Sequence, residues 1–299
     1  MFKNRDIICF FGDSITANGT WIAEIYQYLR TKYKIKCFNC GNAGASAYKA
    51  VDYLHSNCLN YNPDFVVTMF GINDIVHWLY SEKNKDFPNR QQTLDYYFNL
   101  HVEKYEQLIK EIKENGAEII MCLPVPYDEI SNFDSENLFC QARLDEAIEH
   151  QKRIAQKYGC HIVDFRNKIM PYLPEKILYN DDRVHPNDLG HHYMAQIFLN
   201  EIGEKDTLDF DTPFVYEEWN KIRHDAERKY KPIDYVEFCD IYEYWVKNLT
   251  NEEKKQVVRE RLEKYEDKTQ YIPSSYQKYI DNIDIRQRLV GDVVKLTIF

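Results

Sequence analysis

The stretch IICFFGDS, residues 7–14, decides the fold class of this 299-residue chain. Its five apolar residues are far fewer than the roughly 20 that a membrane span needs, and no small-residue cleavage site follows them. We therefore expect neither a membrane span nor a secretory signal here. An apolar, β-branched and aromatic run that ends in Gly-Asp-Ser instead predicts a buried strand followed by a tight turn. A helical pattern starts soon afterwards, at Trp21.

Four further short apolar runs repeat this arrangement along the first two thirds of the chain. Each is rich in β-branched or aromatic residues and is followed by Gly, Pro, Asn or Asp. The expected strands are residues 6–11, 35–39, 65–70, 118–123 and 161–165. Helical patterns lie between them, at residues 21–29, 102–112, 138–158 and 188–202. This alternation predicts an α/β fold with a parallel five-stranded sheet and helices on both faces, in which buried parallel strands are continuously apolar.

Composition narrows the class of partner. Hydrophobic residues make up 44% of the chain, which is enough for a core, and 38 Lys+Arg against 48 Asp+Glu give a net charge of -10. An acidic chain without a long basic run is poorly suited to nucleic acid or to an anionic membrane surface. We therefore expect a cytoplasmic protein whose partner is neither nucleic acid nor a membrane but a small molecule.

The eight cysteines are expected to be reduced, since no export signal accompanies them. Cys37 and Cys40 form a C-x-x-C, but a zinc site would need a second pair at ligand spacing and none follows. Two buried thiols in or beside a strand are the favoured interpretation. The sequence therefore predicts neither a metal nor an organic cofactor.

The strand–helix alternation stops near Ile202, which predicts two domains, residues 1–204 and 205–299. The second is expected to be mainly helical. Its expected elements are a helix from Pro213, an apolar helix face over residues 238–249, a helix capped by Thr250 with Glu253, and an edge strand at 292–299. We expect this extension to pack on the first domain or, as a second possibility, to form a homo-oligomer interface.

Polar residues follow several of the expected strands, at the edge of the sheet where the carboxyl ends of parallel strands lie together. Besides Ser14, they are found in residues 42–46, 71–74 and 182–187. Ligands of open parallel sheets bind at this edge, where helix N-termini offer free N–H groups. A serine, a glycine N–H, a side-chain amide and an Asp–His pair together make up the inventory for nucleophilic acyl transfer.

With four blocks in this order, Phe-Gly-Asp-Ser, Asn-Ala-Gly, Gly-Ile-Asn-Asp and Asp-x-x-His-Pro-Asn, the sequence resembles the SGNH hydrolases. These are the GDSL-type esterases and acyl-hydrolases. The resemblance implies a flavodoxin-like sheet, Ser14 as nucleophile, His185 as general base and Asp182 as its orienting partner. It also implies an oxyanion hole formed by the Ser14 and Gly44 N–H groups and the Asn73 side chain. The absence of a G-x-S-x-G elbow disfavours the α/β-hydrolase fold.

Each of these residues also has a purely structural interpretation. Asn73 could cap a turn, Asp182 could be solvated, and Ser46 is a second serine at the same edge. Rival histidines are His191 and His192, expected on a helix, and His77, His101, His150, His161 and His224, which have no partner pattern. The four blocks taken together favour the catalytic interpretation.

Residues 75–92 form a long connection, and His77, Trp78 and Tyr80 within it are candidate substrate contacts together with Asp13. A second long segment, residues 125–135, is expected at the same edge. Mixed aromatic and polar side chains suit sugars, and members of the resembled family often act on acetylated sugars. We expect an esterase that releases a short acyl group, acetyl, from a carbohydrate. An O-acyltransferase acting on a sugar hydroxyl and a non-catalytic carbohydrate-binding protein remain alternatives.

Overall fold

The computed structural model describes residues 1–130, 140–212 and 233–234. The chain divides into two compact units, Met1–Phe214 and Val215–Phe299. The helices and the edge strand expected between Pro213 and the last residue lie outside the described residues. Beyond residue 212 the structure describes a two-residue strand, β6 (Ile233–Asp234), which was not among the expected elements. The expected division of the chain at residue 204 and the role of residues 205–299 stay predictions.

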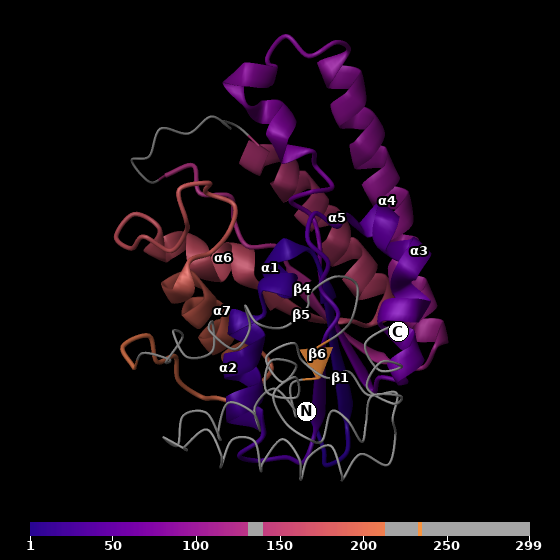
Figure 1. Cartoon of the computed structure of the whole chain (residues 1–299), viewed down its shortest axis with the longest axis vertical. Helices are drawn as coiled ribbons and strands as arrows, with labels where there is room; N and C mark the ends of the chain where they lie inside the picture. Colours follow the sequence, from indigo (N-terminus) through magenta and orange to yellow (C-terminus); the bar gives the residue numbers. More distant parts are fainter. Residues whose placement is uncertain (131–139, 213–232, 235–299) are drawn as a thin grey trace, which may run out of the picture. The chain divides into compact units, whose positions relative to one another are not determined.

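The first unit contains the expected five-stranded parallel sheet (Figure 1). Its strand order is β5-β4-β3-β1-β2, with β1 at Ile7–Gly12, β2 at Lys36–Asn39, β3 at Phe65–Met69, β4 at Glu118–Leu123 and β5 at His161–Asp164. The paired strands run parallel throughout. The expected strand ends differ by at most one residue, which is within the ordinary uncertainty of element ends.

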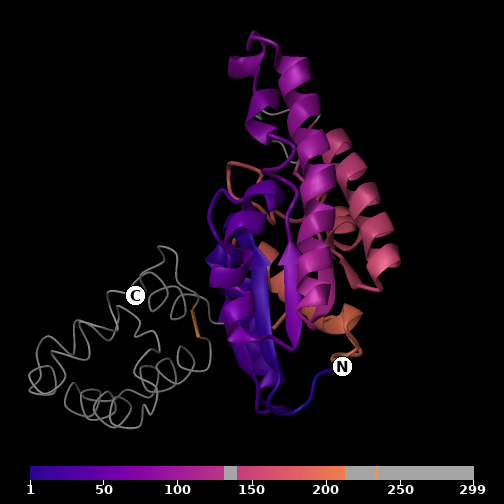
Figure 2. The ribbon, with the colours of Figure 1, turned by 90° about the vertical axis from the view of Figure 1, so that its right-hand side faces the viewer.

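Helices cover both faces of the sheet, as Figures 1 and 2 show. One face carries α2 and α7, which pack on each other, and α6, which packs on α7. The other carries α3, α4 and α5, with α4 between its two neighbours. The helices are α1 (Ser14–Asn18), α2 (Thr20–Leu29), α3 (Ala47–Asn57), α4 (Arg90–Glu114), α5 (Cys140–Tyr158), α6 (Phe165–Ile169) and α7 (Asp188–Glu201). Short 3₁₀ helices are η1 (Leu59–Tyr61), η2 (His77–Tyr80), η3 (Glu82–Asn84) and η4 (Met170–Tyr172).

Helix α3 was not expected from the pattern of apolar residues. Its buried residues are only Ala47, Ala50 and Leu54, so two of the three positions on its inner face are alanine. A stripe of small residues gives a weak periodic signal even where a helix packs closely on a sheet.

The sheet residues alternate between two cores. Phe10 faces α2 and α7, with its ring centroid 5.4 Å from that of Trp21 and 5.9 Å from that of Phe198. Cys9 and Phe11 face the other way, into an apolar cluster that also contains Tyr105 of α4. Both faces of β1 are therefore covered, which explains why its sequence is apolar without alternation.

The connection after β3 contributes structure above the carboxyl edge of the sheet. The expected loop at residues 75–92 contains η2, η3 and the first turn of α4, and this part extends beyond the strand ends (Figures 1 and 2). The other expected edge segment spans residues 125–135, and its residues 131–135 lie outside the described part of the chain.

Candidate active site

Ser14 stands where β1 turns into α1, at the carboxyl edge of the sheet. The turn is close-packed, because a Cβ on Gly12 would lie 2.6 Å from the Met69 carbonyl oxygen on the neighbouring strand. Asp13 caps the short helix by accepting a hydrogen bond from the Ile15 N–H at 3.0 Å. Glycine and a capping aspartate thus serve a turn that presents the next side chain, Ser14, at the sheet edge.

The loop before α7 brings a histidine and an aspartate to this serine. The Ser14 Oγ lies 2.8 Å from His185 Nε2, and His185 Nδ1 lies 2.7 Å from Asp182 Oδ2. The second carboxylate oxygen of Asp182 accepts hydrogen bonds from the backbone N–H groups of Val184 and His185, at 3.0 and 2.9 Å. Because Asp182 can only accept when ionised, Nδ1 carries the proton and Nε2 is left to accept from the Ser14 hydroxyl.

The same contacts change the pKa values of Asp182 and His185. Partial burial alone would raise the pKa of Asp182, but the hydrogen bonds from His185 and Val184 outweigh it and lower the pKa to about 2. The hydrogen bond to Asp182 raises the pKa of His185 above its ordinary value, against a smaller opposing effect of burial. A carboxylate that stays ionised beside the ring stabilises the imidazolium that proton transfer would create.

Gly44 and Asn73 come from the next two strand ends. Gly44 has φ +72°, a left-handed conformation that glycine adopts without strain. The Asn73 amide donates one hydrogen bond to the Ala45 carbonyl at 2.9 Å, which ties it to the Gly44 loop and leaves its second N–H hydrogen for another acceptor. The structure thus joins the two loops that contain the expected oxyanion donors.

Two residues behind these loops were missed by the sequence-based reasoning. Asp74 accepts a hydrogen bond from the Ala47 N–H at 2.8 Å, so Asn73 and Asp74 hold two points of the same loop. His101 of α4 approaches Asp74 with an Nδ1–Oδ1 distance of 3.0 Å, and both side chains are fully buried. Asp74 was visible as the last residue of Gly-Ile-Asn-Asp. His101 gave no signal, because its partner lies on another element.

Asp13 is buried to 2% exposure beside Ser14. Burial raises its pKa to about 7, the Asp74 carboxylate adds to the rise, and the hydrogen bond from Ile15 opposes it. This carboxyl group therefore changes charge near neutral pH at a position adjacent to the serine.

The three candidate substrate contacts of the η2 region differ in their surroundings. His77 Nδ1 lies 3.2 Å from the Ile72 carbonyl, and burial lowers its pKa, with the charge of nearby His185 acting in the same direction. Trp78 is 45% exposed and packs edge-to-face on Phe87 with ring centroids 5.7 Å apart. The Arg90 guanidinium lies over the Tyr80 ring at 5.3 Å. Of the three candidates, His77 is thus the one whose pKa is affected by the charge of His185.

The alternative serine and two of the alternative histidines lie in or at the ends of helices and contribute to packing. Ser46 is buried at the N-cap of α3, and His191 and His192 are buried on α7, as expected. His192 Nδ1 lies 2.9 Å from Glu24 Oε1 of α2. The contact between His192 and Glu24 joins α7 to α2. Of the two serines at this edge, Ser14 is the one whose hydroxyl is hydrogen-bonded to His185.

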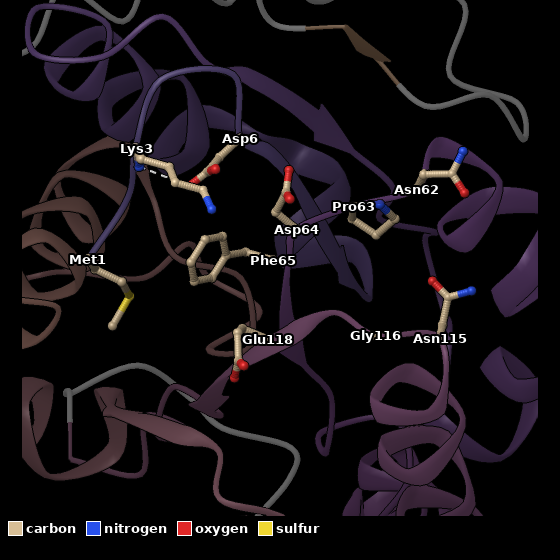
Figure 3. Close-up of a pocket in the computed structure, with 10 residues that line it drawn as sticks. All are labelled: Met1, Lys3, Asp6, Asn62, Pro63, Asp64, Phe65, Asn115, Gly116 and Glu118. Atoms are coloured by element: carbon tan, nitrogen blue, oxygen red, sulfur yellow. Dashed lines mark hydrogen bonds between the residues drawn. The ribbon is translucent and has the colours of Figure 1, made fainter.

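Two hollows lie at opposite edges of the sheet. A small one at the carboxyl edge is lined by Asp13 and Val184, next to Ser14 and His185, and by apolar residues such as Ile72 and Tyr127. A larger one, of about 320 Å³, opens at the amino ends of the strands between Lys3, Asp6, Asp64, Phe65 and Glu118 (Figure 3). The larger hollow therefore does not contain Ser14.

Within the described part of the chain, one group of side chains has the spacing of metal ligands: Cys9, Cys40 and Cys58. It belongs to the apolar core under α3, and the catalytic candidates are not part of it. The described residues also contain no helix long and apolar enough to cross a membrane.

This fold and the chemistry at its carboxyl edge place the chain among the α/β enzymes that hydrolyse carboxylic esters. The family follows from comparison with known proteins. The model of the GDSL-like lipase/acylhydrolase family matches residues 10–193, more than half of the chain, and the chain belongs to this family. The resemblance to SGNH hydrolases that the four blocks carried is thereby confirmed.

Relatives and solved structures agree with this assignment. An acetylxylan esterase of Geobacillus stearothermophilus is 28% identical over 222 residues, which are 66% of this chain and 93% of the esterase. The structure of a catalytic mutant of an acetylxylan esterase from the same organism has a TM-score of 0.58 at 24% identity, with 68% of this chain and 97% of that chain covered. A gut microbial diltiazem-metabolizing enzyme has a TM-score of 0.60 at 26% identity over 68% of this chain, which spans about half, 48%, of that enzyme.

Proposed function

We propose that this protein is a serine esterase that removes short acyl groups, acetyl above all, from a carbohydrate. The observation that carries the proposal is the hydrogen-bonded series from Ser14 Oγ through His185 to Asp182, with distances of 2.8 and 2.7 Å. A hydroxyl beside a neutral imidazole that is held by a carboxylate is the arrangement that activates a serine for acyl transfer.

In the proposed reaction, His185 Nε2 takes the Ser14 proton as Oγ attacks the ester carbonyl. Asp182 accepts a hydrogen bond from the Nδ1–H group of His185 and stabilises the imidazolium. The oxyanion of the tetrahedral intermediate accepts hydrogen bonds from the Ser14 and Gly44 N–H groups and from the Asn73 amide. His185 then returns its proton to the leaving alcohol, and an acyl-enzyme forms on Ser14. Water, activated by the same histidine, releases the acid and restores the serine.

Solvent access favours water as the acyl acceptor. The His185 side chain is 41% exposed and that of Asp182 is 50% exposed. An acyltransferase has to keep water away from its acyl-enzyme, and an open imidazole does not do so. Hydrolysis is therefore the favoured outcome over transfer to a sugar hydroxyl.

Three observations support a short acyl group on a carbohydrate. The hollow bounded by Asp13 and Val184 has room for about one water-sized group, which suits a methyl better than a long chain. The relative that is 28% identical along 93% of its length is an acetylxylan esterase. The exposed Trp78 offers an aromatic face of the kind that packs on sugar rings.

The test compares turnover on p-nitrophenyl esters of increasing acyl length and on acetylated and deacetylated xylo-oligosaccharides. We expect kcat/KM to be highest for acetyl and acetate to be released from the acetylated oligosaccharide. Ser14→Ala is the control for background hydrolysis. Best turnover on acyl chains of C8 or longer would contradict the short-chain assignment, and acyl transfer to an added sugar in preference to hydrolysis would select the transferase.

A further inference from the structure

Three cysteines that are far apart in the sequence meet in the core. Cys9 lies in β1, Cys40 follows the last residue of β2, and Cys58 is the C-terminal cap residue of α3. Their sulfur atoms all lie within 4.8 Å of one another. Their exposed fractions are 0%, 3% and 0%. This spacing is what three ligands of a single metal ion require, and it is independent of the candidate active site.

The strand register explains why these three residues meet and why Cys37 does not join them. Cys9 pairs with Phe38 across the parallel strands, so Cys40, two residues further on, lies on the same face of the sheet. Cys37 pairs with Ile8 and lies on the opposite face. Helix α3 covers the Cys9 face, and its last turn delivers Cys58. The C-x-x-C of the sequence is thus divided between two faces, and its second cysteine finds partners from elsewhere.

The surroundings favour sulfur chemistry with a soft ion. The cluster lies among apolar side chains, including Phe11, Phe38 and Leu54. A thiolate is the form of cysteine that binds metal, and thiolate ligands suit a soft ion.

We propose that Cys9, Cys40 and Cys58 bind one Cu(I) ion in a three-sulfur site. Thiolates select soft ions, and magnesium, calcium and manganese prefer oxygen ligands. Zinc sites are almost always four-coordinate, and within the described residues only these three ligand atoms come together. Cu(I), by contrast, is satisfied by three sulfurs. On binding, the ion replaces thiol protons, which leave to solvent, so the affinity increases with pH.

The site would link the elements that approach the catalytic edge. Cys9 is on the strand that leads to Ser14, Cys40 immediately precedes the loop that contains Gly44, and Cys58 ends the helix that follows this loop. An ion bound only by the folded state stabilises that state according to its concentration and affinity. The reduced protein should therefore unfold at a higher temperature with Cu(I) than without it.

The experiment is an anaerobic titration of the reduced full-length protein with Cu(I) buffered by a chromophoric chelator. We expect one tightly bound ion per chain. Loss of a group outside the ligand set already costs about 10–100-fold in metal affinity, so Cys9→Ala, Cys40→Ala and Cys58→Ala should each cost at least about 100-fold. Cys122→Ala is the matched control, because Cys122 is a fully buried strand thiol outside the cluster, and Cys160→Ala controls for a more accessible thiol.

X-ray absorption of the Cu(I)-loaded wild type needs no variant to fold and should give three sulfur neighbours. Equal affinity in the wild type and all three cluster variants would overturn the proposal, and so would binding that is lost only with Cys160. Nitrogen or oxygen neighbours at the metal, or tighter binding of Zn(II) than of Cu(I), would also overturn it. A heat-stability increase seen in Cys122→Ala and absent in Cys40→Ala would support it.

Discussion

The two edges of the sheet both present carboxylates beside a hollow, but they use them differently. At the amino edge, Asp64 accepts a hydrogen bond from the Ile7 N–H at 2.9 Å. Asp6 accepts one from the Lys3 N–H at 2.9 Å (Figure 3). Glu118 pairs with Lys113 at 3.1 Å. At the carboxyl edge, Asp182 holds His185, which in turn contacts a serine hydroxyl.

This difference indicates that connected hydrogen bonds are a better guide to the candidate active site than the size of a pocket. The amino-edge carboxylates bind backbone N–H groups where strands begin or form a surface ion pair, which completes their role in the fold. The carboxyl edge collects the turns that lead into helices, so a series of polar side chains can end on a nucleophile. Variants at the carboxyl edge should therefore lose activity, and variants at the amino edge should keep it.

The largest expected effect is that of Ser14→Ala. Without the hydroxyl no acyl-enzyme can form, and kcat should fall by on the order of 10⁵–10⁶-fold. The measurement is p-nitrophenyl acetate hydrolysis with active-site titration by a serine-reactive phosphonate. Glu118→Gln at the amino edge is the matched control and should retain wild-type kcat. Equal losses in both variants would remove the distinction between the edges.

Asp182→Asn should cost about 10⁴-fold in kcat, because an amide can hold the imidazole in the wrong tautomer. In the wild type, kcat/KM should fall as pH decreases through a His185 pKa that lies above the ordinary value of about 6.5. Removing the carboxylate lowers that pKa, so the acid limb of the residual activity should move to lower pH. A pH profile identical in the two proteins would show that Asp182 does not act on His185.

Asn73→Ala tests the oxyanion donors and should lower kcat by about 10²–10³-fold with a smaller change in KM. The side chain also anchors the Ala45 carbonyl, so circular dichroism and urea unfolding have to accompany the kinetics. A variant that unfolds normally and keeps its full kcat would exclude Asn73 from transition-state stabilisation.

His101→Asn tests whether the buried partner of Asp74 positions the Gly44 loop. A small displacement of a catalytic group can cost up to about 10²-fold in rate, and we expect a loss in kcat no greater than this with KM unchanged. The loss should appear for acetyl esters of good and poor leaving groups alike. Loss of stability with kcat retained would assign His101 to the core alone.

Asp13→Asn should change catalysis least and the pH dependence of stability most. Unfolded aspartate titrates near 3.9, whereas the buried Asp13 titrates at about 7, so the folded state holds a proton that the unfolded state has lost in this window. The contribution of Asp13 to the free energy of unfolding therefore falls as pH rises from about 4 to about 7. The variant keeps an acceptor for Ile15 and should be more stable above pH 7, by up to about 4 kcal/mol. Urea unfolding at pH 5 and pH 8 measures this difference, and parallel curves for the two proteins would contradict it.

Local pattern was sufficient to predict the scaffold and to single out the candidate catalytic groups. Five apolar runs located the strands, and Gly-Asp-Ser with Asp-x-x-His located the hydroxyl, imidazole and carboxylate that the structure brings together. These features are legible because each lies within a few residues of a strand end or of its partner. Helix α3 escaped detection because its inner face is mostly alanine.

What depends on contact between distant segments could not be predicted in this way. The Asp74–His101 pair joins a loop to α4, and the C-x-x-C was judged by its own spacing although Cys40 meets Cys9 and Cys58. In the same way, the pKa of Asp13 depends on the burial that neighbouring strands impose.

The sequence by itself determined the parallel α/β scaffold, the family and the order of the polar blocks along the chain, because strand and turn preferences act over short ranges. Only the tertiary structure decided which carboxylates are buried, that His101 lies beside Asp74 and which cysteines meet. The physical reason is that parallel pairing and helix packing bring residues together across many intervening positions. Proton affinity and ligand spacing arise from those neighbours and not from the order of the residues.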